Sequence, residues 1–210
     1  MNASTIQIDN ISEIESQAFK NGLLIPLPSF FYKQFTRNQI EYFCWKYGIY
    51  VVPTTELIAF LEENSKGSTI EIGCGHGAIG RALNIPMTDS KLQDDKQVRQ
   101  FYKATNQPTI KYPVDVIELD AIDAIKKYNP TTVIGAFITH KYTPNTQTGN
   151  MFGVVEGKIL KSVQKYIHIG NLNTHKYKPI LKNEHTEQYF HWLITRSQDQ
   201  SKNRIYIWNK

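Results

Sequence analysis

The stretch Thr69-Ile70-Glu71-Ile72-Gly73-Cys74-Gly75-His76-Gly77-Ala78-Ile79-Gly80 decides the fold. It opens as a short β-rich run, turns through glycines at every second position, and continues into small helix-forming residues. A strand, a glycine loop and a helix in this order place a nucleotide-like ligand at the helix N-terminus. The stretch therefore predicts a class of ligand, and other parts of the chain must supply the chemistry done on it.

The composition is that of one globular domain, or of one domain with an appendage. The chain has 210 residues, 40% of them hydrophobic and 20% charged, which is enough for a sizeable core. Its two cysteines, Cys44 and Cys74, and the spacing of its histidines match no disulfide framework and no zinc site. The first twenty residues are polar, and no apolar run reaches the roughly 18–20 residues of a membrane span. We therefore expect a cytoplasmic protein with no membrane partner and no metal.

The net charge of +5 is unevenly distributed. Residues 151–210 hold 10 Lys and Arg against 4 Asp and Glu, whereas residues 1–150 hold 14 against 15. A basic C-terminal third permits an acidic partner such as nucleic acid, and residues 158–182 with Tyr166 and Tyr177 would serve it. A lysine-rich solvated surface explains the same charge, so nucleic acid is permitted but not required.

Residues 1–53 are expected to form a helical extension rich in aromatic side chains. Ser12 and Glu15 fit a capping box for a helix over 12–20. Residues 29–47 carry eight aromatic residues, with charges at intervals of three to five, which is typical of one or two amphipathic helices. Such a run serves either as an aromatic wall over a ligand or as core packing.

Residues 54–210 alternate strands with helices, which predicts a doubly wound parallel sheet. Thr54 or Thr55 can cap the helix over 55–64. The polar residues 91–113 are expected to carry a helix or a mobile segment. The predicted fold is α/β: a doubly wound, mostly parallel seven-stranded sheet with a C-terminal antiparallel strand pair, plus the N-terminal extension. Helices are expected over 55–64, 78–84, 121–128 and 154–166, and strands over 69–72, 85–90, 114–118, 132–139, 166–170, 191–196 and 204–208.

Gly73, Gly75 and Ala78 also satisfy the dinucleotide fingerprint, which is a weak match when it stands alone. Glu71 argues against a nicotinamide cofactor, because a carboxylate two residues before the first glycine could hold a cationic ligand group. The alternation of glycines through Gly77 and the terminal antiparallel pair point the same way. An NAD-dependent oxidoreductase therefore stays a lower-ranked alternative.

With these residues in place, the chain resembles the class I S-adenosylmethionine (SAM)-dependent methyltransferases over roughly Thr54 to Trp208. Their first motif is acidic-x-Gly-x-Gly-x-Gly, and residues 71–77 match it in full. The resemblance implies SAM as cofactor. It implies that Asp89, ending the second strand, binds the ribose hydroxyls, that Asp120 holds the adenine, and that the methionine end lies near Thr139. The cofactor-binding residues implied are Glu71, Gly73, Cys74, Gly75, His76, Gly77, Asp89, Asp120, Ala121 and Thr139.

Several of these residues have a second interpretation. Asp89 could cap the helix that follows it, and Asp120 could equally cap the helix over 121–128. Cys74 reads as a small residue tolerated in the loop and not as a nucleophile. His76 could meet the ligand through its backbone alone.

Methyl transfer is an in-line displacement at a sulfonium-bound carbon, in which the protein supplies orientation and any base. The base is expected beyond the fourth strand, and the candidates are His140, Lys141 and Tyr142, with Glu156 behind them. A histidine there could accept a proton at neutral pH. A solvated loop histidine explains His140 equally.

The motifs that name an acceptor are missing. Amino-directed DNA methyltransferases carry Asn/Asp-Pro-Pro-aromatic after the fourth strand, where this chain has Thr139-His140-Lys141-Tyr142. The carbon-directed cytosine enzymes need a Pro-Cys nucleophile, and neither cysteine follows a proline. The acceptor is therefore unknown, whether small molecule, protein or nucleic acid. The alternative is a catalytically silent SAM-binding, nucleoside-binding or scaffold protein on the same fold.

Overall fold

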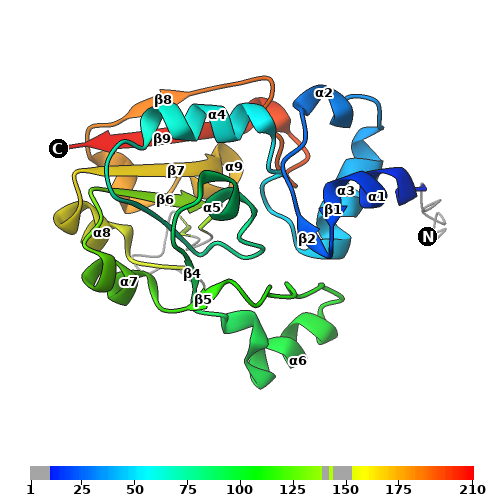
Figure 1. The fold of residues 1–210 in the computed structure, drawn as a ribbon, viewed down its shortest axis with the longest axis horizontal. Helices are drawn as coiled ribbons and strands as arrows, with labels where there is room; N and C mark the ends of the chain where they lie inside the picture. The colour runs from blue at the N-terminus through cyan, green and yellow to red at the C-terminus, as the bar shows by residue number, and fades with distance from the viewer. Residues whose placement is uncertain (1–9, 139–141, 144–152) are drawn as a thin grey trace.

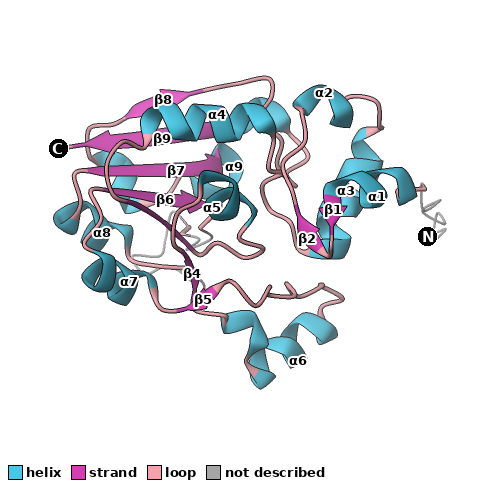
Figure 2. Cartoon of the chain, viewed as in Figure 1, coloured by secondary structure: helices cyan, strands magenta, loops and turns pink. Residues whose placement is uncertain are grey.

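A computed structural model describes residues 10–138, 142–143 and 153–210. A seven-stranded sheet runs through the molecule with helices on both faces (Figure 1, Figure 2). Its order is β5-β4-β3-β6-β7-β9-β8, and β9 runs in the direction opposite to the other six strands of this sheet. The predicted α/β doubly wound sheet is confirmed. Its strands are β3 (Thr69–Ile72), β4 (Met87–Asp89), β5 (Ile117–Glu118), β6 (Thr132–Ala136), β7 (Lys165–Asn171), β8 (Thr186–Gln188) and β9 (Asn203–Asn209).

The two faces of the sheet are covered by different helices. Helices α7 (Ala121–Tyr128) and α8 (Glu156–Ser162) cover one face, while α4 (Thr55–Asn64) and α5 (Ala78–Leu83) cover the other. Side chains alternate between these faces along each strand. In β7, for example, Tyr166 packs with the α7 and α8 cluster and Ile167 with the α4 cluster. The apolar runs of the central strands are thus buried on both sides.

The N-terminal extension packs its aromatic residues into a core of its own. It comprises α1 (Ser12–Ala18), the hairpin β1 (Phe19–Lys20) and β2 (Leu23–Leu24), α2 (Ser29–Tyr32) and α3 (Arg37–Tyr47). Tyr32 and Phe43 are fully buried at its centre. For the aromatic run over 29–47, core packing is therefore the interpretation that the contacts support. The domain boundary expected after residue 53 stays a prediction.

The insertion after β4 folds back onto this extension. A 3-10 turn η1 (Leu92–Asp94) leads into α6 (Lys96–Ala104), which Asp95 caps through the backbone N–H groups of Gln97 and Val98. The extended segment that follows buries Ile110, whose side chain packs closely on Gly48. The helix expected within residues 91–113 is therefore present as α6, and the segment after it reaches the candidate site.

Three local predictions are wrong. Ser12 does not cap α1, since the Asn10 carboxamide oxygen accepts its backbone N–H and Ile11 occupies the cap position. β5 is two residues long, with Val114 fully exposed just after Pro113. β9 pairs with β8, not with residues 191–196, of which Thr195 instead bridges Val51.

Several other predicted elements are shorter than expected, including β4, which was expected over 85–90, and the two that follow. α8 spans Glu156–Ser162 because β7 begins three residues after it. β6 ends at Ala136, because Phe137 takes a left-handed backbone conformation and leaves the strand. The remaining short elements are α9 (Leu172–His175), η2 (Pro179–Lys182) and η3 (Gln200–Lys202). Among the helices that the structure describes, none has the length and apolar character needed to cross a bilayer.

Candidate functional site at the carboxyl ends of β3, β4 and β6

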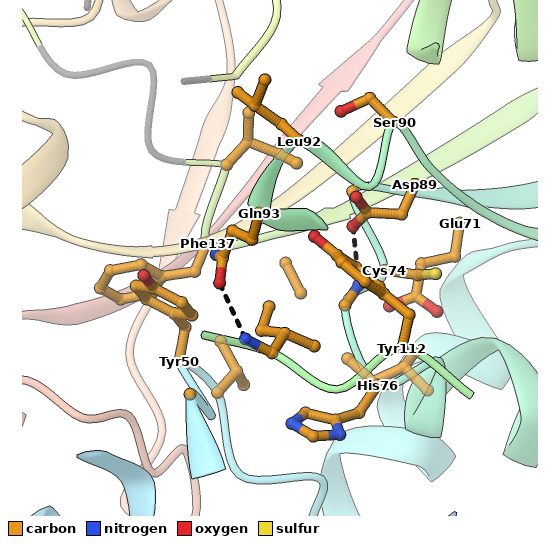
Figure 3. A pocket seen from close by; sticks show the side chains of 18 of the residues that line it. Tyr50, Glu71, Cys74, His76, Asp89, Ser90, Leu92, Gln93, Tyr112 and Phe137 are labelled. Atoms are coloured by element: carbon orange, nitrogen blue, oxygen red, sulfur yellow. Dashed lines mark hydrogen bonds between the residues drawn. The ribbon is translucent and has the colours of Figure 1, made fainter. Parts of the chain in front are cut away.

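A cavity of about 400 Å³ lies where the strand order reverses. The chain leaves β3 toward β4 on one side, and β6 pairs on the other, so the carboxyl end of β3 is the switch point where open α/β sheets bind ligands. The glycine loop forms the floor of the cavity. Tyr50 of the extension and Leu92, Gln93 and Tyr112 of the 91–113 insertion line it (Figure 3).

The floor needs glycines for steric reasons. Gly73 and Gly77 have φ values of +55° and +64°, a region that side chains rarely adopt. A Cβ on Gly73 would lie 2.5 Å from Cδ1 of Ile138, and one on Gly77 would lie 2.5 Å from Sδ of Met87. Glycine at these two positions therefore avoids backbone strain and crowding against Ile138 and Met87.

Glu71 is buried beneath the loop, with 1% of its surface exposed. Its Oε2 accepts the backbone N–H of Gly80 at 2.7 Å, in the first turn of α5. This contact substitutes for a cap, because the cap residue Gly77 has no side chain. Burial raises the pKa of Glu71 from 4.5 to about 8, although the Gly80 N–H opposes the shift. The carboxyl also lines the cavity, and it is mostly protonated at neutral pH.

Asp89 ties the loop to the end of β4. Its Oδ2 accepts the N–H of Gly75 at 2.9 Å, and its Oδ1 accepts the N–H of Lys91 at 2.8 Å (Figure 3 shows the first). The Tyr112 hydroxyl also hydrogen bonds to it, while burial raises its pKa. It caps no helix, since η1 has no side-chain cap. A carboxylate offers about four acceptor positions, so room remains for a ligand hydroxyl.

Cys74 and His76 occupy the loop between the glycines and line the cavity. Burial raises the pKa of the Cys74 thiol, and the nearby carboxyls of Glu71 and Asp89 raise it further, so the thiol stays uncharged. The His76 Nε2 lies 2.7 Å from the Tyr47 carbonyl oxygen, and burial lowers the pKa of its ring. A neutral His76 therefore donates from Nε2 and fastens the extension to the loop, a role that the sequence did not indicate.

Asp120 and Ala121 line the cavity beside the end of β5. Asp120 is the cap of α7, and its Oδ1 accepts the N–H of Ile122 at 2.8 Å. The capping interpretation of Asp120 is therefore realised. It uses one carboxylate oxygen, which leaves the ligand-binding interpretation standing as a prediction.

Of the predicted catalytic residues, the structure describes Tyr142 and Glu156. Thr139, His140 and Lys141 lie outside the described residues. Tyr142 is buried, and among the described residues it does not line the cavity. Glu156 is also buried: its Oε1 accepts the hydroxyl of Tyr166 at 2.8 Å and its Oε2 accepts the Nζ of Lys178 at 2.6 Å. Both oxygens of Glu156 thus hold protein groups.

The outer wall of the cavity consists of residues that sequence reasoning missed. The side-chain Oε1 of Gln93 accepts the backbone N–H of Ile110 at 2.9 Å, which fixes the insertion over the cavity. No local pattern pairs residues 48–53 with 91–113, because these segments meet only in the folded chain. The wall is formed by Leu24, Tyr50, Leu92, Gln93, Tyr102, Ile110 and Tyr112.

Phe137 stands at the carboxyl end of β6 with a φ of +56°. For a bulky residue this conformation costs on the order of 1–3 kcal/mol, and such strain gathers at functional sites. Its ring centroid lies 4.8 Å from that of the buried His175 ring and 5.6 Å from that of Tyr50. The contacts on both sides hold Phe137 as part of the wall. No group of three or more potential ligand side chains able to hold a metal occurs in the described part of the chain.

The comparisons with known proteins are distant. No protein-family model and no curated protein matches the chain. A solved structure of a "putative RNA methyltransferase" from Pyrococcus horikoshii is 12% identical with a TM-score of 0.34, covering 74% of this chain and 80% of its own. A Thermoplasma acidophilum protein is 10% identical with a TM-score of 0.37, covering 81% and 94% respectively. Similarities of this size bear on neither ligand nor activity.

Proposed function

We propose that the chain is a SAM-dependent methyltransferase of unknown acceptor, with a cytoplasmic location. The observation that carries the proposal is the joint geometry of Glu71, Gly75 and Asp89. The full acidic-x-Gly-x-Gly-x-Gly motif lies at the switch point, and the Asp89 carboxylate at the end of β4 accepts a hydrogen bond from the middle glycine, Gly75. This brings together, beside one cavity, the groups that the resemblance assigns to the ribose and methionine ends of SAM.

The chemistry of these groups fits the cofactor. When bound, SAM supplies an electrophilic methyl carbon on a sulfonium. Asp89 keeps acceptor capacity for ribose hydroxyls, and Asp120 reaches the cavity from the neighbouring strand end. Burial raises the pKa of the Glu71 carboxyl, and a cationic amino group bound beside it would lower that pKa again. The site therefore favours a cationic ligand group next to Glu71. The buried side chain of Ile110 and the rings of Tyr50, Tyr102 and Tyr112 offer apolar surface to the nucleoside.

One observation favours the silent alternative. The ionisable cavity-lining groups Glu71, His76, Asp89 and Asp120 all hold parts of the protein through hydrogen bonds. A proton acceptor for the reaction would then come from His140 or Lys141, which stays a prediction. An oxidoreductase has less support, because the dinucleotide fold orders parallel strands 3-2-1-4-5-6, whereas here the antiparallel β9 separates β7 from β8.

Calorimetry with SAM and with its demethylated product tests the proposal. Wild type should bind both, and Asp89→Ala should weaken binding by about tenfold or more, the worth of a hydrogen bond to a charged group. Asp123→Ala is the matched control, because Asp123 lies on the exposed side of α7 and should leave binding unchanged. No binding of either compound below 1 mM would overturn the proposal.

Transfer of a radiolabelled methyl group into cell extract separates enzyme from silent binder. Turnover by wild type that is lost in Asp89→Ala and in Gly75→Val supports the enzyme. Gly75→Val acts on the backbone, because Gly75 has a φ of +53°. Cofactor binding without turnover supports the silent protein.

A further inference from the structure

A second groove of about 390 Å³ lies near the outer wall of the cavity. Its lining alternates with that of the cavity along the insertion: Tyr102 lines the cavity and Lys103 the groove, while Ile110 lines the cavity and Thr109 the groove. The groove is therefore close to the candidate site without being part of it. Its lining residues are Trp45, Arg99, Lys103, Asn106, Gln107, Pro108 and Thr109.

The charge of this groove comes from one stripe of α6. Lys96, Arg99 and Lys103 are spaced i, i+3 and i+7, so they share a helix face, and α6 contains no acidic residue. Among the described residues, Lys96 and Lys103 take part in no ion pair. Arg99 pairs with Asp94, but that pair is exposed, so salt and a competing anion weaken it readily.

The other residues that line the groove are suited to binding nucleobases. Trp45 is half-buried, and its indole stacks on Tyr42 with ring centroids 5.8 Å apart and planes 20° apart. This support holds the indole as a flat platform. Asn106 and Gln107 add side-chain amides that can donate to and accept from base edges. Cations beside an aromatic platform are the combination that binds single-stranded nucleic acid.

We propose that this groove, formed by Trp45, Arg99, Lys103 and residues 106–109, binds single-stranded nucleic acid. The phosphates would contact the α6 stripe and a base would stack on Trp45. An acidic peptide would satisfy the cations and the amides but leave the indole without a role. The segment over 158–182 is less suited, since Tyr166 and Lys178 are buried there. Binding of nucleic acid in this groove does not depend on the proposed function. The further step, that nucleic acid is the methyl acceptor, rests on the proposed function.

Fluorescence anisotropy with a labelled 12-nucleotide single strand tests the groove, over salt from 50 to 200 mM. Wild type should bind with affinity falling as salt rises, and quenching of tryptophan fluorescence should report the stacking. The double variant Arg99→Gln/Lys103→Gln should lose about tenfold in affinity and reduce the salt slope by roughly 1 to 2. Trp45→Phe should abolish most of the quenching.

Lys158→Gln is the matched control, because Lys158 is exposed on α8, away from α6 (Figure 1). No binding at 50 mM salt, or an equal loss in the control, would overturn the proposal. Equal competition by polyglutamate would also overturn it in favour of an acidic protein partner. Calorimetry with SAM on the same variants keeps the two proposals apart, since groove substitutions should leave cofactor affinity unchanged.

Discussion

The substitution Glu71→Gln should make the stability of the fold much less dependent on pH. In the unfolded chain Glu71 titrates near 4.5, and in the fold its pKa is about 8 because burial disfavours the charge. The folded state therefore binds the proton more tightly than the unfolded state. The carboxyl is harmless below pH 4.5, and it destabilises the fold increasingly as the pH rises toward 8.

The size of this effect follows from the pKa difference. A shift of about 3.5 units at 1.36 kcal/mol per unit costs about 5 kcal/mol at most, and about 3.5 kcal/mol of that arises between pH 5 and pH 8. Glutamine has the shape of the protonated acid, keeps an oxygen for the Gly80 N–H, and does not ionise. We therefore expect the variant to match wild type within about 1 kcal/mol at pH 5 and to exceed it by about 4 kcal/mol at pH 8.

Urea denaturation at pH 5, 6, 7 and 8, followed by far-ultraviolet circular dichroism, measures the free energy of unfolding of both proteins. Their difference isolates Glu71, because the other groups titrate alike in both. Glu118→Gln on the exposed edge strand β5 is the control, and the same difference in this variant would contradict the assignment of the effect to Glu71. A flat difference for Glu71→Gln, or a wild type more stable at pH 8, would refute the reasoning and mean that the folded state stabilises the charge.

Three further predictions concern single contacts, and urea denaturation measures each. Gly77→Ala should cost about 1–3 kcal/mol, because it strains the left-handed position and crowds Met87, and it should weaken SAM binding; unchanged stability would contradict this. Lys178→Met should cost about 3–5 kcal/mol by leaving the Glu156 carboxylate unpaired, and adding Glu156→Gln should recover most of it; no recovery would show that the pair is not the cause. Thr54→Ala should cost about 1 kcal/mol, since its Oγ1 accepts the first-turn N–H of α4 at 3.2 Å; a neutral effect would contradict the cap.

Much of the fold could be predicted because its signals are local. Thr54 and Asp120 begin helices through contacts within three residues, so both helix starts were predicted correctly. The helix over 121–128 and the strand at 69–72 have the expected bounds. The alternation of such elements then predicts a doubly wound sheet.

The wrong strand pairing has a clear physical cause. A short β-rich run such as 191–196 can pair with any strand edge, and its hydrophobic pattern does not name the partner. In the structure β9 pairs with β8, while Phe190 and Trp192 stack on each other and pack against Phe60 of α4. Charge has the same ambiguity: Glu156 and Lys178 look like surface residues in the sequence, yet they form a buried pair.

The sequence by itself determined the floor of the candidate site, because alternating glycines, an acidic residue before them and an aspartate at the end of the next strand are features of neighbouring residues. Only the tertiary structure decided the walls. His76 reaches back 29 residues to Tyr47, and Gln93 reaches forward 17 residues to Ile110. Contacts of that separation depend on how the extension and the insertion pack on the sheet, which no local pattern encodes. The tertiary structure also decided the state of Glu71, since burial, and not its place in the motif, sets its pKa.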